Sequence, residues 1–133
     1  MDVVRALRQA VALLRIVVAL LIGIHGVTRI THHGVGGLGD FLVTQHVPLG
    51  HAVAWAITTF EIFGALCLLL GRLVVFVAPV HILILATGIV MVHRHHGWFV
   101  VGGGTGGMEY SVLLIAALAA LFWAARGERL YRR

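Results

Sequence analysis

Four long apolar runs alternate with shorter polar stretches along the chain. A helix that crosses a bilayer needs about 20 mostly apolar residues, because each residue adds about 1.5 Å. The pattern therefore predicts four transmembrane helices, at about residues 10–30, 52–70, 73–92 and 108–125. The connection at residues 71–72 is a tight turn, and a short interfacial helix is expected at about 38–46. The predicted fold is an all-α, four-transmembrane-helix bundle.

Composition supports a membrane protein over a soluble one. The 133 residues are 60% hydrophobic and 11% charged, with a mean hydropathy of +1.02. Soluble domains are about 45–50% apolar and about 25% charged. Four spans use most of the chain, so we expect one integral membrane domain over residues 1–133, multi-pass in the cell (cytoplasmic) membrane. The apolar stretch within residues 1–24 is too long for a signal peptide and is expected to stay as an anchor.

The net charge of +5 does not indicate nucleic-acid binding, because of where the arginines lie. Seven of the ten lie at the ends of the chain or in the short middle turn, against Arg29 and Arg94 on the expected outer side, and no basic run is interleaved with aromatic residues. Such a bias is typical of cytoplasmic loops. We therefore expect both termini and the 71–72 turn to be cytoplasmic, and the 31–51 and 93–107 loops to be extracytoplasmic. The arginines that carry this argument are Arg5, Arg8, Arg72, Arg126, Arg129, Arg132 and Arg133.

Three ionisable residues interrupt the apolar helices: Arg15, Glu61 and His81. An acidic side chain at mid-helix costs about 2.5–3.5 kcal/mol on insertion scales, so it should be paired or functional. Stripes of small residues on each helix should pack against one another and turn these groups inward. We expect an intramembrane polar network in which Glu61 pairs with Arg15 or His81. It is either a structural clamp, a proton relay or an anchor for a ligand headgroup.

A second group of polar residues is expected at the extracytoplasmic rim. His25 and Arg29 lie one turn apart near the end of the first span, and Glu109 and Tyr110 open the last span. A carboxylate, an imidazole and a guanidinium together suit a polar ligand, so these four are the ligand-binding candidates. Alternatively, Glu109 simply caps its helix, where the helix dipole favours an acidic residue.

The loop histidines raise the question of a metal or haem. His93, His95 and His96 are weak metal candidates, because imidazole is a common zinc or copper ligand but no HxxxH or HExxH motif is present. Haem would require a facing pair such as His25 and His93. The single Cys67 excludes an intramolecular disulfide and a CxxC pair, so redox chemistry would need a bound cofactor or a partner's thiols.

Several short motifs, in this order and spacing, make the chain resemble the DoxX family of small four-helix membrane proteins. They are Leu14-Arg15, His25-Gly26 with Arg29, Glu61, Leu69-Leu70-Gly71, and Gly106-Gly107-Met108-Glu109-Tyr110. Two features depart from the family pattern. Arg29 stands where a lysine is common, which keeps the charge but not the geometry. The arginine-rich tail lacks the glycine-rich ending of many relatives.

The resemblance implies a membrane subunit linked to redox chemistry. Founding relatives are described as part of a thiosulfate–quinone oxidoreductase, and others associate with thiol and superoxide-detoxifying enzymes. A quinone is therefore the expected ligand, ahead of haem or a metal, and the lipid bilayer and a redox protein are the expected partners. A homo-oligomer is compatible with this expectation. The alternative is a non-catalytic membrane anchor or assembly factor, because the fold alone does not fix the function.

Overall fold

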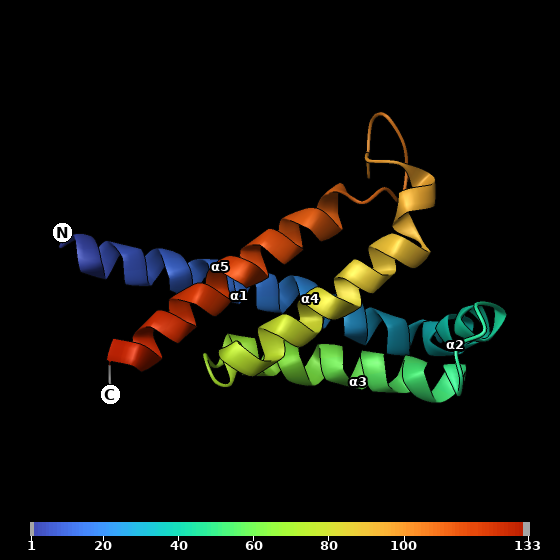
Figure 1. Ribbon diagram of the computed structural model, residues 1–133, viewed down its shortest axis with the longest axis horizontal. Coiled ribbons are helices and arrows are strands. Elements are labelled where there is room, and N and C mark those ends of the chain that lie inside the picture. Colours follow the sequence, from blue (N-terminus) through green and yellow to red (C-terminus); the bar gives the residue numbers. More distant parts are fainter. Residues whose placement is uncertain (1, 132–133) are drawn as a thin grey trace.

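Helices account for nearly all of the regular structure. The structure, a computed structural model, describes residues 2–131, without the side chains of residues 129–131. No strand occurs within this range. In a bilayer each backbone N–H and C=O group must find a partner within the protein, which favours helices for apolar runs of this length. The elements are α1 Val3–Thr31, α2 Gly34–Thr44, α3 Gly50–Leu69, α4 Val74–Met91, the short 3-10 helix η1 His93–His96 and α5 Glu109–Tyr131 (Figure 1).

The helices α1, α3, α4 and α5 are each long and apolar enough to cross a bilayer. This confirms the predicted all-α fold with four membrane-spanning helices. The helix α1 starts at Val3, well before the predicted residue 10, because the Asp2 side chain caps it by accepting from the Val4 N–H at 3.3 Å. The short helix α2 also begins earlier than predicted, at Gly34 rather than near Leu38.

Two helix pairs form the bundle. The helix α1 packs against α3, with α2 lying over the first half of α3, while α4 packs against α5. Close approach of α1 and α3 depends on two glycines. A Cβ atom at Gly26 would lie 3.0 Å from Ile62 Cγ1, and one at Gly23 would lie 3.3 Å from Ala65 Cβ. The expected contact between small-residue stripes is therefore present, and it sets the register of α1 against α3.

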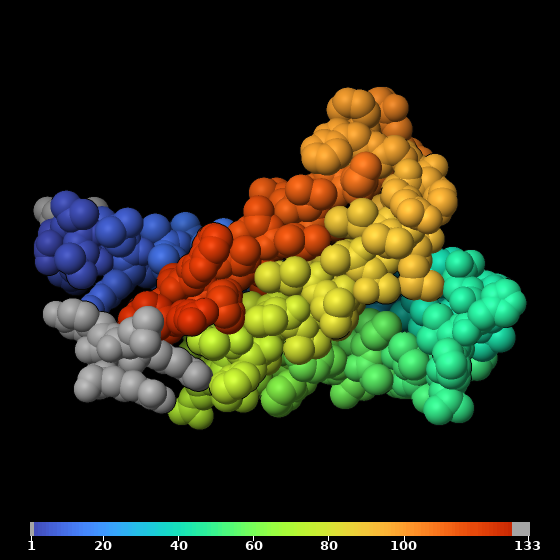
Figure 2. Space-filling model, viewed as in Figure 1, coloured from blue at the N-terminus to red at the C-terminus, as the bar shows by residue number. Residues whose placement is uncertain are grey.

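The two ends of the bundle differ. One end, which we call the terminal end, contains the start of α1, the end of α5 and the α3–α4 turn (Figure 1). The other, called the loop end, carries α2 and the 92–108 loop, which projects as a separate lobe (Figure 2). The α3–α4 turn is tight, as predicted: Gly71 adopts a φ of +67° and the Arg72 N–H donates to the Cys67 carbonyl at 2.8 Å.

Candidate functional site

An ion pair between α1 and α3 lies inside the bundle. Arg29 Nη1 lies 2.5 Å from Glu61 Oε2 and also donates to Thr58 Oγ1 at 3.2 Å. The Thr58 hydroxyl in turn donates to the Ala54 carbonyl at 2.8 Å. Both charged side chains are largely buried, with exposed fractions of 16% for Arg29 and 9% for Glu61. The charge of Glu61 is therefore balanced within the protein, as the cost of burying it requires.

The partner of Glu61 is not one of the two that the sequence indicated. Because Gly26 packs against Glu61 and Ile62, the next turn of α1 brings Arg29 to the level of Glu61. Arg15 lies fourteen residues earlier in α1, about 21 Å away along the helix axis, beside Gly71 at the terminal end. Arg15 therefore does not belong to the network with Glu61 and His81.

The pair also lies deeper than the predicted rim. Glu61 follows Gly50 by eleven residues and precedes Leu69 by eight, so it lies about 17 Å and about 12 Å from the two ends of α3. His25, one turn before Arg29, lies at a similar level. This depth follows from the position of α2. Because α2 packs against the first half of α3, with Val35 and Leu42 beside Ala54, α1 ends before it reaches the level at which α3 begins.

His81 is the other buried ionisable residue of this region, with 2% of its surface exposed. Its ring lies against the backbone of Gly64, where a Cβ atom would overlap it, and tilts against Phe60 at a centroid distance of 5.1 Å. The Nδ1 atom lies 3.1 Å from the Val77 carbonyl, so in the neutral ring Nδ1 carries the proton. The Nε2 atom is buried against Gly64 and has no hydrogen-bond partner among the described residues.

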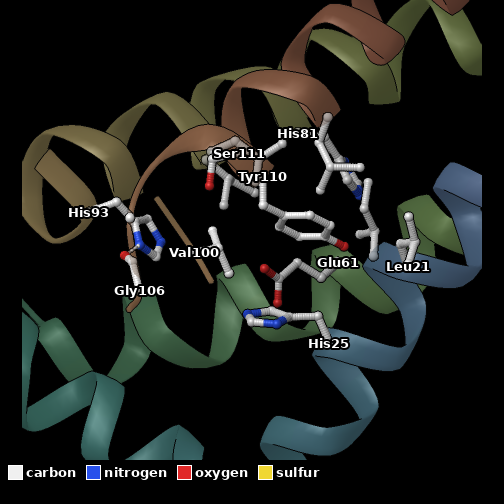
Figure 3. A pocket seen from close by; sticks show the side chains of 14 residues that line it. Leu21, His25, Glu61, His81, His93, Val100, Gly106, Tyr110 and Ser111 are labelled. Carbon is white, nitrogen blue, oxygen red and sulfur yellow. Dashed lines mark hydrogen bonds between the residues drawn. The ribbon is translucent and has the colours of Figure 1, made fainter. Parts of the chain in front are cut away.

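A cavity of about 190 Å³ connects these groups to the loop end (Figure 3). Residues of all four spanning helices, η1 and the 97–107 loop line it. Its polar wall is formed by His25, Glu61, His81, His93, Tyr110 and Ser111, and its apolar wall by Leu21, Ile22, Ile84, Leu85 and Leu114 together with Val100. The cavity thus combines several groups that exchange protons or hydrogen bonds with an apolar surface.

The exposed part of this wall shows where the cavity opens. Leu21 and Tyr110 are 37% and 41% exposed and His25 is also exposed, all three from α1 or α5, and Gly106 of the loop is exposed as well. The residues from α3 and α4, Glu61 and His81, are buried. Leu21 and His25 lie midway along a membrane-spanning helix, so an exposed surface there faces lipid. The lining of the cavity is therefore exposed on the side of α1 and α5, which faces the bilayer, and at Gly106 in its roof.

Glu109 closes the loop that forms the roof of the cavity. Its Oε1 atom accepts from the Val100 N–H at 2.8 Å, and its own N–H donates to the Trp98 carbonyl at 3.0 Å. Gly107 allows the two ends of the loop to pack closely, because a Cβ atom at this position would lie 2.5 Å from the backbone of Trp98 and Phe99. Glu109 is not in the cavity wall; among the predicted rim residues, only His25 and Tyr110 line it.

The loop histidines bond mainly to nearby backbone groups. The Nδ1 atom of His93 lies 2.8 Å from the Gly106 carbonyl, and that of His96 lies 3.1 Å from the Val92 carbonyl. His95 accepts from its neighbour Arg94 at 3.3 Å. No group of three or more His, Cys, Asp or Glu residues lies close enough together to hold a metal ion in the part of the chain that the structure describes. His25 and His93 both line the cavity.

Two polar residues of the site were not predicted from the sequence. Thr58 lies one turn before Glu61, and its hydroxyl holds the Arg29 guanidinium. Ser111 follows Tyr110 and is 4% exposed in the cavity wall. Thr58 belongs to the same expected small-residue stripe of its helix as Glu61, whereas the only sequence signal for Ser111 was a hydroxyl within an apolar run, which is common in membrane helices because the hydroxyl can bond to the preceding turn.

The comparison with protein families gives a match to the DoxX family over residues 10–94, from the second turn of α1 through α4 and into η1. This confirms the resemblance suggested by the sequence motifs. The match ends before the Gly106–Tyr110 motif. No curated protein and no solved structure matches the chain.

Proposed function

Because the chain belongs to the DoxX family and has four apolar helices that can span a bilayer, we propose that it is the membrane subunit of a redox system and binds a quinone in the cavity between α1 and α5. The single observation that carries this proposal is the cavity itself, whose mainly apolar wall carries several polar side chains and is exposed on the side of α1 and α5. A quinone has the matching chemistry: a ring with polar oxygens and a lipid-soluble tail.

The volume of the cavity suits the headgroup of a quinone rather than the whole molecule. Pockets for drug-sized molecules occupy about 300–1,000 Å³. A volume of about 190 Å³ accepts a single substituted ring. The tail of the quinone would leave through the opening beside Leu21 and Tyr110 and lie among the lipid chains.

The polar groups of the wall suit both redox states of the ring. The Glu61 carboxylate, which lines the cavity, accepts a hydrogen bond that a quinol hydroxyl supplies. The Tyr110 and Ser111 hydroxyls and the His25 ring donate to quinone carbonyls. His25 and Glu61 line the same wall, and histidine exchanges protons near neutral pH. Cys67 is the only cysteine and is buried, so the electrons would come from a partner protein or its cofactor.

We further propose that the terminal end faces the cytoplasm and the 92–108 loop faces outward. Arg5, Arg8 and Arg72 all lie at the terminal end, and arginine is enriched in cytoplasmic loops. In this orientation the cavity roof, and any partner that docks on it, is extracytoplasmic.

A second function, as an anchor or assembly factor, is favoured by the surface of the 92–108 loop. Trp98, Phe99 and Val101 are 49%, 50% and 75% exposed there, although they lie outside the spanning helices. Exposed apolar residues of this kind often mark a docking surface. Under this alternative the protein would hold a partner without binding a quinone.

The proposal is tested by titrating the detergent-purified protein with a short-tailed ubiquinone analogue. We expect saturable binding that weakens about tenfold, or about 1.4 kcal/mol, in His25→Ala and in Tyr110→Phe, because each loses one hydrogen bond to the ring. His95→Ala, which removes an exposed histidine outside the cavity, is the matched control and should bind as the unmodified protein does. Circular dichroism checks the fold of each variant.

Equal affinity in all four proteins would contradict the cavity as the binding site. Absence of saturable binding, with a stoichiometric protein partner copurifying in mild detergent, would favour the anchor function.

A further inference from the structure

A second cavity, of about 170 Å³, lies at the terminal end between α1, the α3–α4 turn and α5. Arg8 and Arg15 line it from α1, and Gly71 lines it from the turn. Val11, Val74 and Leu121 form apolar walls, and Glu128 lies at its edge. The proposed quinone site does not include any of these residues, so this cavity has no role in the function proposed above.

Arg15 is the unusual member of this cavity. Its side chain is partly buried and lies so close to Gly71 that a Cβ atom there would overlap the guanidinium. Within the described part of the chain, it has no hydrogen bond and no ion pair. A guanidinium carries several N–H donors that need acceptors. In the part of the chain that the structure describes, the carbonyls at the end of α3 accept from backbone N–H groups instead: Leu66, Cys67 and Leu68 accept from residues 70, 72 and 71.

The depth of Arg15 indicates what supplies those acceptors. The twenty residues of α3 extend about 30 Å, which equals the thickness of the hydrocarbon core. The α3–α4 turn, and Arg15 beside it, therefore lie at the boundary between lipid chains and headgroups. Lipid phosphates lie at this level. Arg8 follows the same face of α1 two turns nearer to the aqueous phase, where the rest of a headgroup would extend.

We propose that this cavity binds the phosphodiester of an anionic phospholipid. The Arg15 guanidinium donates to the phosphate oxygens, and Arg8 adds a second positive charge nearby. An acyl chain leaves the cavity past Val11, a partly buried apolar residue of its wall. Two arginines and Glu128 give the cavity a net charge of +1, which matches the single negative charge of a lipid such as phosphatidylglycerol. The Glu128 carboxylate accepts from the hydroxyls of its glycerol headgroup.

The test is native mass spectrometry of the full chain in detergent, with phosphatidylglycerol, phosphatidylcholine or inorganic phosphate added. We expect one phosphatidylglycerol to stay bound under conditions that remove phosphatidylcholine and phosphate. Arg15→Gln should weaken this binding about tenfold, the loss expected for a charge-assisted hydrogen bond. Arg5→Gln is the matched control: it removes the same charge from an exposed position of α1 outside the cavity, and it should retain the lipid.

A second variant keeps the test decisive if Arg15→Gln does not fold. Arg15→Lys keeps the charge but loses the paired N–H donors, so it should bind more weakly than the unmodified protein and more tightly than Arg15→Gln. Equal losses in Arg5→Gln and Arg15→Gln would contradict a specific site, because charge alone would then explain the binding. Retention of inorganic phosphate with the same affinity would contradict the lipid as the ligand. The quinone titration is independent of both results.

Discussion

Replacing Glu61 with alanine is expected to lower the free energy of unfolding by about 3–5 kcal/mol, because the Arg29 guanidinium is left unpaired near the middle of the span. Glu61→Gln should cost less, since the amide oxygen still accepts from Arg29. The measurement is chemical or thermal unfolding in detergent micelles.

Two further variants identify the origin of the loss. In Arg29→Met/Glu61→Leu both charges are absent, so most of the stability should return, and the cycle completed by the single variants Arg29→Met and Glu61→Leu gives the coupling energy. Asp40→Ala removes a carboxylate from an exposed pair with His51 at 3.4 Å, and its effect should stay within about 0.5 kcal/mol. If Glu61→Ala and Asp40→Ala destabilise the protein equally little, the buried pair does not exist.

Gly64→Ala should destabilise the protein by about 1–3 kcal/mol, because the new methyl group displaces the His81 ring from its buried position against α3. Gly88→Ala is the matched control in a helix interior. Its Cβ would meet only His93 Cδ2, at 3.9 Å, so it should be neutral or stabilising by up to about 1 kcal/mol. Unfolding in the same detergent compares the two. Similar effects of both substitutions would show that His81 does not pack on Gly64.

The sequence predicted the four spans and the turn between the second and third, because the physics behind them is local. A bilayer requires about 20 apolar residues per helix, and Gly71 suits the positive φ of a turn. The sequence also predicted that small residues of α1 and α3 would be in contact. It did not predict the register of the two helices, because a stripe such as Ala19, Gly23 and Gly26 packs equally well at several offsets.

That register explains why the partner of Glu61 was predicted incorrectly. Residue counting gives the depth of a side chain only relative to the end of its own helix. The helix α1 ends inside the bundle because α2 covers the outer half of α3, so Arg29 lies level with Glu61 rather than at the rim. Arg15 was expected to reach Glu61 from nearer the cytoplasmic face with its long side chain, whereas its guanidinium lies beside Gly71 at the terminal end.

Glu109 illustrates a different limit of sequence reasoning. Its two expected roles, as a helix cap and as a ligand contact, were both inferred only from its position at the start of a helix. Its observed partner, the Val100 N–H, lies nine residues earlier in a loop that folds back on itself. Such a return depends on close approach at Gly107, which a run of glycines permits at several positions.

Photoaffinity labelling with an azido-quinone tests the central claim, that the cavity between α1 and α5 binds a quinone ring, most directly. The purified protein is irradiated with the probe, digested and analysed by peptide mass spectrometry, with and without an excess of the unlabelled quinone. We expect competed labelling on two stretches that face the cavity, residues 21–25 of α1 and 110–114 of α5. Labelling confined to the exposed loop residues 98–101, or labelling that the unlabelled quinone does not reduce, would contradict the account.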